Sequence, residues 1–182
     1  MSIYHYEKVD QENIQEKFTN DRKHRCYLSI PFLNKDGDKT LCVIGQNPSK
    51  ASKKYADRTV LYLEKFVCDN LPKYSSIIIL NLFTIVDTTK NQDEDLTRTE
   101  CAEMFEKILN EMEDFLVVYG KIENEGSYSF VDKAKSLKTM LKDKSVFKID
   151  IGSDYAPHPR NPLIHFSNYS LNLTPYYFED IN

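Results

Sequence analysis

Residues 41–44 form a short apolar run that ends at a glycine, two amides and a proline. Four apolar residues bounded by chain-breaking residues are typical of a short buried β-strand. Gly45 allows the backbone to pass close to a ligand, and Pro48 favours an extended conformation at Asn47. Open α/β sheets bind ligands beyond the carboxyl ends of their strands, which makes this loop a candidate site. An ordinary strand-to-loop turn uses the same residue types.

Three further apolar runs follow the first, and segments with helical apolar periodicity lie between them. The apolar runs are residues 77–80, 115–119 and 146–151, and the helical segments are residues 59–68, 99–112 and 132–141. Strands that alternate with helices predict a parallel sheet with helices on both faces. We therefore predict an α/β fold of three αβα layers around a central, mostly parallel, four-stranded sheet.

The chain is predicted to form one domain. Residues 1–25 are polar and are interpreted as an N-terminal lead-in, and residues 26–182 as the domain, because 182 residues would be cramped for two cores. Residues 26–32 alternate loosely and could form a strand, and a hairpin-type turn signal follows at 34–38, before the strand at 41–44. This order suggests an antiparallel entry into the central sheet. Residues 87–97 are predicted to be a polar loop.

Charge and hydropathy limit the classes of partner. A net charge of −4 argues against binding a long stretch of nucleic acid by electrostatic attraction. Lys50, Lys53, Lys54 and Arg58 nevertheless gather after the first apolar run, where they could create a local positive field or simply form a solvated face. No apolar run approaches the length of a membrane span, and the N-terminus lacks a secretory pattern. We predict a cytoplasmic protein with no membrane partner.

The four cysteines predict neither a metal site nor a disulfide framework. They show no paired spacing and lie in apolar or helical segments, at Cys26, Cys42, Cys68 and Cys101. Buried, reduced thiols are the expected state. No metal and no other cofactor is predicted.

Polar residues follow the predicted strands at the point where each one ends. They are Gln46 and Asn47, Asn81, Tyr119 with Gly120, and the proline-rich loop that contains His158. The carboxyl ends of parallel strands meet at one edge of a sheet, so these residues predict a polar pocket on a rigid frame.

Four short motifs occur in order at these strand ends. They are Gly45-Gln46-Asn47-Pro48-Ser49, Ile78-Ile79-Leu80-Asn81-Leu82-Phe83-Thr84, Leu116-Val117-Val118-Tyr119-Gly120-Lys121 and His158-Pro159-Arg160-Asn161-Pro162-Leu163. Together they resemble the uracil-DNA glycosylase superfamily and, more closely, the DUF1643 family, whose motifs also include the Asp-x-Thr found at residues 57–59. The resemblance spans about residues 26–166 and implies a uracil-DNA glycosylase-like fold.

The resemblance also implies roles for individual residues. Asn47 would orient the attacking water, Asn81 would pair with the edge of a base, and His158 would donate to the base oxygen that gains charge. Tyr55 would stack on the base, and Asp57 could supply a carboxylate. The predicted substrate-binding residues are Gly45, Gln46, Pro48, Ser49, Tyr55, Asn81, Phe83, Gly120 and Arg160.

Several positions depart from the superfamily's pattern. An amide at position 47 cannot act as a general base and can only orient a water. Ser49 and Lys50 replace an aromatic residue that excludes larger bases, and Arg160-Asn161 replaces a serine. Asp57 also suits the role of a helix N-cap, which we consider its primary role. His158 in a loop also fits an exposed surface histidine.

Two functions follow from these residues. The first is a nucleobase-recognising N-glycosidase that uses an oriented water to remove a damaged, mismatched or modified base. The second is a catalytically weak or inactive module that binds a nucleotide or modified base in the same pocket. The predicted partner is accordingly DNA or a nucleotide-like or nucleoside-like small molecule.

Overall fold

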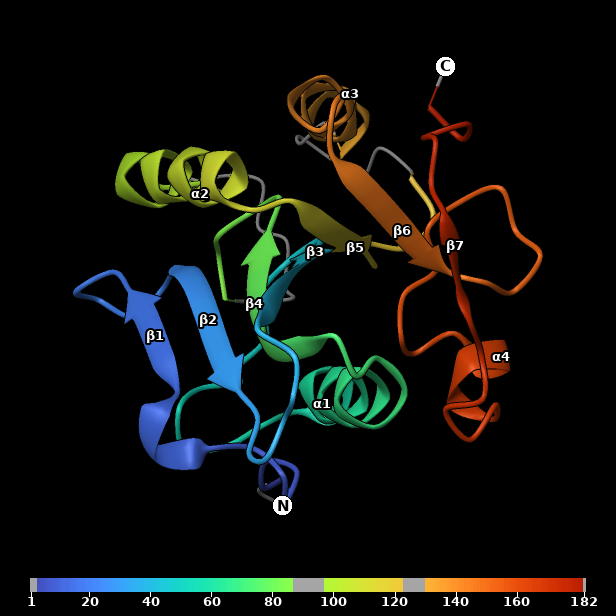
Figure 1. Ribbon diagram of the computed structural model, residues 1–182. Helices are drawn as coiled ribbons and strands as arrows, with labels where there is room; N and C mark the ends of the chain where they lie inside the picture. The colour runs from blue at the N-terminus through green and yellow to red at the C-terminus, as the bar shows by residue number, and fades with distance from the viewer. Residues whose placement is uncertain (1–2, 87–96, 123–129, 182) are drawn as a thin grey trace.

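A seven-stranded mixed sheet organises the protein in a computed structural model that describes residues 3–86, 97–122 and 130–181 (Figure 1). The strand order is β1-β2-β4-β3-β5-β6-β7. The strands are β1 (Gln15–Phe18), β2 (Arg25–Pro31), β3 (Lys39–Gly45), β4 (Tyr74–Asn81), β5 (Asp114–Val117), β6 (Ser145–Ile149) and β7 (Leu173–Pro175). Strands β4, β3, β5 and β6 run parallel to one another, whereas β1, β2 and β7 join by antiparallel pairing.

The predicted four-stranded sheet is therefore corrected to a seven-stranded sheet in which parallel and antiparallel pairings both occur. The four strands predicted from apolar runs form its parallel centre. The flanking strands β1 and β7 are short and half-exposed, so they carry no apolar run that would reveal them. The predicted antiparallel entry into the central sheet is confirmed, because β2 runs antiparallel to β4, which lies between β2 and β3 and pairs with both.

Helices cover both faces of the sheet and enclose two separate cores. On one face α1 (Arg58–Asn70) and the short α4 (Pro162–His165) pack on the sheet, and on the other α2 (Thr99–Glu111) and α3 (Phe130–Met140) do so (Figure 1). Successive residues of a strand face opposite sides, so β3 places Val43 in the α1 core and Ile44 in the α2–α3 core. Both faces of the central strands are thus buried.

The N-terminal residues are part of this architecture. A short 3-10 turn, η1 (Gln11–Asn13), leads into β1, which pairs with β2. An isolated bridge also pairs Ile3 with Ala56. The predicted polar loop at 87–97 lies almost wholly outside the described residues. Among the described helices, none has the length and apolar character needed to cross a membrane.

A disulfide joins Cys26 in β2 to Cys101 in α2, contrary to the prediction that all four thiols are reduced. The other two cysteines, Cys42 and Cys68, are free and buried. The sequence gives no signal for this pairing, because 75 residues separate the two cysteines. Only the packing of α2 beside β2 brings their Cα atoms to 4.5 Å from each other.

Candidate functional site

A cavity of about 310 Å³ opens at the carboxyl ends of β3 and β4, on the face of the sheet that α1 covers. Its floor is apolar and comes from Val43 on β3, Ile79 on β4, Val118 just after β5 and Leu63 on α1. Its upper part is polar and comes from the loops that leave these strands. An apolar floor with a few convergent polar groups is the usual composition of a small-molecule site.

Most of the site residues predicted from the sequence line this one cavity. They are Gly45, Gln46, Asn47, Pro48, Ser49, Asp57, Asn81, His158 and Arg160. They come from the ends of β3 and β4, from the residue before α1 and from the loop before α4. Segments separated by more than one hundred residues in the chain therefore meet at a single place.

Three predicted substrate-binding residues are not among the described residues that line the cavity. The ring of Tyr55 packs 5.7 Å from the ring of Tyr4, centroid to centroid. Phe83 is buried in the core of the α2–α3 face, with its ring 6.4 Å from that of Phe130. Gly120 has a φ of +91° and lies behind His158, where an added Cβ would be 3.6 Å from the histidine Cβ. The prediction that these three residues contact the ligand directly therefore has no support from the cavity lining.

Gly45 and Asn81 are opposite each other in the pairing of β3 with β4. A Cβ atom on Gly45 would lie 2.6 Å from Nδ2 of Asn81, closer than two such atoms approach in proteins. The missing side chain therefore makes room for the Asn81 amide at the edge of the cavity. This close approach is the reason for a glycine at the end of β3.

Arg25 is a cavity residue that the sequence analysis missed. It begins β2, which runs antiparallel to β4, so its first residue lies beside the end of β4 and Arg25 N–H donates to Thr84 O. Its side chain donates from Nη1 to the carbonyl of Ala51 at 2.9 Å and from Nη2 to Oδ1 of Asn81 at 3.2 Å. Arg25 is only 3% exposed, and its Nε has no hydrogen-bond partner among the described residues. A charged residue just before an apolar strand was the available signal.

Asn81 has its amide orientation fixed by this contact. A guanidinium group only donates hydrogen bonds, so the Asn81 atom that faces Arg25 must be the oxygen. The amide nitrogen consequently lies over Gly45, on the side of the β3 loop. Asn81 is 7% exposed and lines the cavity, so its amide is held in one orientation at the site.

His158 is held as a neutral imidazole. The backbone N–H of Arg160 donates to its Nδ1 at 3.1 Å, which leaves the proton on Nε2. Burial and the charge of Arg160 lower the pKa of His158, and the more distant Asp57 only partly offsets them. His158 is thus a hydrogen-bond donor through Nε2 at neutral pH.

Asp57 caps α1, as the sequence suggests for an aspartate before a helix. Its Oδ1 accepts a hydrogen bond of 2.7 Å from Val60 N–H. The same residue lines the cavity, so the cap also carries a carboxylate to the site. Among the described residues, Oδ1 makes the only hydrogen bond of this carboxylate.

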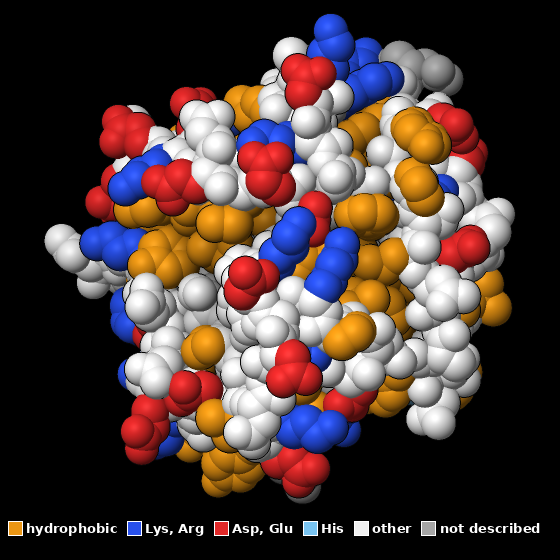
Figure 2. Space-filling model, viewed as in Figure 1, with side chains coloured by type: hydrophobic (Ala, Val, Ile, Leu, Met, Phe, Trp, Pro, Cys, Tyr) orange, Lys and Arg blue, Asp and Glu red, His pale blue; other side chains and the backbone are white. Residues whose placement is uncertain are grey.

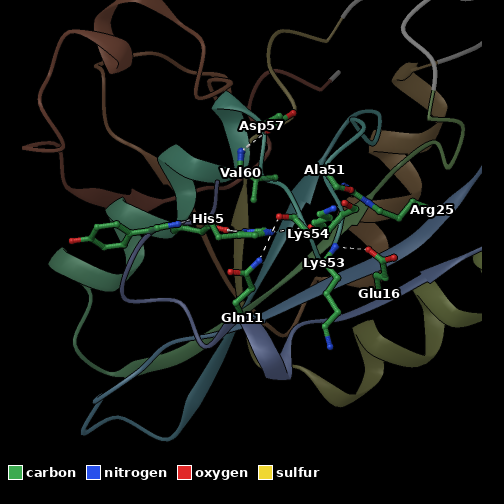
Figure 3. A network of polar contacts seen from close by, with 12 residues as sticks. His5, Gln11, Glu16, Arg25, Ala51, Lys53, Lys54, Asp57 and Val60 are labelled. Carbon is green, nitrogen blue, oxygen red and sulfur yellow. Dashed lines mark hydrogen bonds and ion pairs between the residues drawn. The ribbon is translucent and has the colours of Figure 1, made fainter. Parts of the chain in front are cut away.

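The loop between Ser49 and Asp57 is held on both sides by residues outside the predicted motifs (Figure 3). From the N-terminal segment, Gln11 donates to the carbonyl of Lys54 and Glu16 accepts from Lys53 N–H at 2.5 Å. His5 donates from Nε2 to the carbonyl of Ser52, and Arg25 holds Ala51 from the other side. The segment that connects Asn47 to Asp57 is therefore fixed by residues 5–25.

The site's charged groups are few. Arg25 and Arg160 bring positive charge, Asp57 brings negative charge, and His158 is neutral. Across the face of the molecule seen in Figure 2, acidic and basic side chains are interspersed. Within the described parts of the chain, no three His, Cys, Asp or Glu side chains gather as a metal site would require.

These features define an α/β protein with a cavity, its candidate ligand site, at the carboxyl edge of a mixed sheet. A family model described as "Protein of unknown function (DUF1643)" matches residues 28–163, and the chain belongs to this family. The resemblance to DUF1643 is thereby confirmed, and the resemblance to the uracil-DNA glycosylase superfamily stays a prediction. Searches of the curated proteins and of the solved structures gave no match.

Proposed function

We propose that this DUF1643 protein is a nucleobase-recognising N-glycosidase with a uracil-DNA glycosylase-like fold. It hydrolyses the N-glycosidic bond of a damaged, mismatched or modified base by means of an oriented water. The observation that carries the proposal is the single cavity that brings together Asn47, Asp57, Asn81 and His158. Two of these groups serve each of the two requirements of the reaction.

The first requirement is to hold the base and to stabilise the charge that it gains as it departs. Asn81 binds the edge of the base, and Arg25 keeps its amide in one orientation. His158 donates from Nε2 to the base oxygen on which negative charge develops. A neutral donor suits this task, and the hydrogen bond from Arg160 N–H to Nδ1 favours that protonation state.

The second requirement is a water directed at the anomeric carbon of the sugar. Asn47 orients this water through its amide, since an amide is not basic enough to deprotonate it. The water oxygen bonds to the anomeric carbon as the bond to the base breaks, and the base leaves with the electron pair of that bond. The proton released by the water passes to the carboxylate of Asp57.

One observation favours the second candidate function, a binding module without effective catalysis. Asp57 already uses Oδ1 to cap α1 through Val60 N–H, which leaves it a less available base. A cavity that binds the base but activates water poorly would sense or sequester a nucleotide or modified base. The two functions share the same ligand contacts and differ in turnover.

The test is to incubate the purified protein with DNA that carries a panel of damaged, mismatched and modified bases, and to assay released base and abasic sites. We expect His158→Ala to lower the rate of base release by about 10²-fold or more, the typical effect of losing one donor to developing charge. His165→Ala is the matched control, because this histidine is exposed on α4 and should leave the rate unchanged.

The outcomes separate the two functions. Base release that His158→Ala abolishes and His165→Ala preserves supports the glycosidase. Binding of the same DNA or of free nucleotides without base release supports the binding module. Base release that survives in His158→Ala at the wild-type rate would contradict the assigned chemistry.

A further inference from the structure

Arg25 carries a buried positive charge that no carboxylate neutralises by direct contact among the described residues. Its side chain makes two hydrogen bonds, and both acceptors, Ala51 O and Asn81 Oδ1, are uncharged. Its Nε lacks a partner among the described residues, although the residue is only 3% exposed. A buried charge is costly unless it is paired, so such a group calls for an anionic partner.

Two carboxylates, Asp57 and Glu16, act on the charge of Arg25 from a distance, and each is hydrogen-bonded to another group. Asp57 accepts from Val60 N–H at the start of α1, and Glu16 pairs with Arg22 at 3.5 Å and with Lys53 N–H. Burial lowers the pKa of Arg25 to about 10, with Asp57 and Glu16 acting in the opposite direction at longer range. The guanidinium therefore stays charged at neutral pH.

The lining of the cavity offers several hydrogen-bond donors besides Arg25, and Asp57 is the one carboxylate among the described residues that line it. The Oδ1 of Asn81 is occupied by Arg25, so its amide nitrogen is the free end of that side chain. His158 presents a donor through Nε2, and Arg160 adds a second guanidinium to the lining. A ligand that matches these groups carries acceptors and negative charge.

We propose that Arg25 makes this cavity selective for a phosphate group of its ligand, so that the natural ligand is a nucleotide and not a nucleoside or free base. The inference rests on the proposed function in one respect, which is that the same cavity binds the ligand. It adds the anionic group and the residue that selects it. Arg25 acts both directly, through its charge, and as a positioning residue for Asn81.

The experiment measures the affinity of the full chain for deoxynucleoside 5′-monophosphates, for the matching nucleosides and for inorganic phosphate by titration calorimetry. We expect each monophosphate that binds to do so at least about tenfold more tightly than its nucleoside, the effect of one hydrogen bond to a charged group. Arg25→Met should remove this preference. Lys135→Met, which deletes one positive charge from the exposed face of α3, should preserve it.

A second variant covers the case in which Arg25→Met fails to fold. Asn81→Asp keeps an oxygen acceptor for Arg25 and gives it the carboxylate partner that it lacks, so this variant should fold. It neutralises the guanidinium without truncating it. The ratio of monophosphate to nucleoside affinity should therefore fall to about one, whatever happens to recognition of the base.

Each outcome bears on one proposal or the other. Equal affinity for nucleosides and monophosphates in the wild-type protein would overturn the phosphate selectivity and leave base recognition intact. A preference that persists in both Arg25→Met and Asn81→Asp would also overturn it. Binding of inorganic phosphate that Asn81→Asp abolishes, without any nucleoside binding, would support Arg25 and contradict the proposed nucleobase site. A protein that binds none of these ligands would refute both.

Discussion

Two buried polar pairs, His5–Glu64 and Arg25–Asn81, lie on either side of the loop that connects Asn47 to Asp57, and they are satisfied to different degrees. In the first pair, His5 Nδ1 donates to Glu64 Oε1 at 2.5 Å, and Glu64 Oε2 accepts from Tyr6 N–H. His5 Nε2 donates to the carbonyl of Ser52, so every polar atom of the two side chains has a partner. In the second pair, Arg25 Nε has none, and both residues line the cavity.

This difference indicates what each pair is for. A fully bonded pair enclosed by protein contributes to one stable conformation, here the attachment of the N-terminal segment to α1. A pair that faces a cavity and carries an unneutralised charge can gain further favourable interactions when a ligand binds. The two pairs thus separate the structural contacts of this loop from its contacts with the binding site.

Removing Glu64 should produce the largest loss of stability. The carboxylate is fully buried, and Glu64→Ala would leave His5 Nδ1 and Tyr6 N–H without their acceptor. Breaking a buried pair by deleting one partner typically lowers the free energy of unfolding by about 3–5 kcal/mol. Urea unfolding followed by circular dichroism measures this change.

The matched control for Glu64 is Asp69 on the same helix. Asp69 also holds the N-terminal segment to α1, through Tyr6 and Lys8, but its side chain is 37% exposed. Asp69→Ala should therefore change the unfolding midpoint little. Equal losses for the two variants would contradict a structural role that depends on burial.

Breaking the disulfide should have the next largest effect on stability. It closes a loop of 75 residues between β2 and α2, and Cys101→Ser should lower the free energy of unfolding by about 2–4 kcal/mol. Arg25 is next to Cys26 but is held by Ala51, Asn81 and the backbone of Thr84. Ligand affinity, measured by calorimetry well below the unfolding temperature, should stay at the wild-type value. A parallel loss of affinity would show that Arg25 depends on the cross-link.

The sequence predicted the centre of the molecule better than its edges. The strands β3 and β4 and the cap at Asp57 are local features, because apolar runs and capping residues show themselves within a few positions. The positions of Arg25 and His5 depend on which strands and helices become neighbours. Segments interpreted as a lead-in supply contacts that only the tertiary fold reveals, and the same holds for the disulfide.

A methyl group at Gly45 should sharpen the comparison, because it perturbs the binding pair and spares the structural one. The new Cβ would lie 2.6 Å from Asn81 Nδ2, so the amide must move and its bond to Arg25 must lengthen. Gly45→Ala should lower the free energy of unfolding by about 1–3 kcal/mol, as overpacking does, and should greatly reduce ligand affinity. Adding Asn81→Ala to this variant should relieve the clash, so that the double variant is more stable than the sum of the two single losses predicts, but it should not restore the affinity. A double variant as unstable as the sum of the singles would place the clash elsewhere.

The smallest effects should come from the two histidines beside these pairs, which should titrate in opposite directions. His5 donates from both ring nitrogens, to a carboxylate and to a carbonyl, so it is an imidazolium. Burial alone would lower its pKa, but the hydrogen bond and charge of Glu64 outweigh burial and raise the pKa above 6.5. His158 accepts at Nδ1, and burial and Arg160 lower its pKa below 6.5.

Linkage gives these shifts opposite consequences for stability. The contribution of His5 is fully present below pH 6.5, the value for the unfolded chain, and is lost as the pH rises through its higher folded pKa. The folded state resists protonation of His158, so stability falls as the pH drops from 6.5 through the lower folded pKa. Nitrogen-15 NMR of the imidazole rings at pH 7 should show His5 doubly protonated and His158 neutral with its proton on Nε2. A neutral His5 would remove the charge from the structural pair, and a charged His158 would add a third cation to the cavity, so either result would break the contrast between the two pairs.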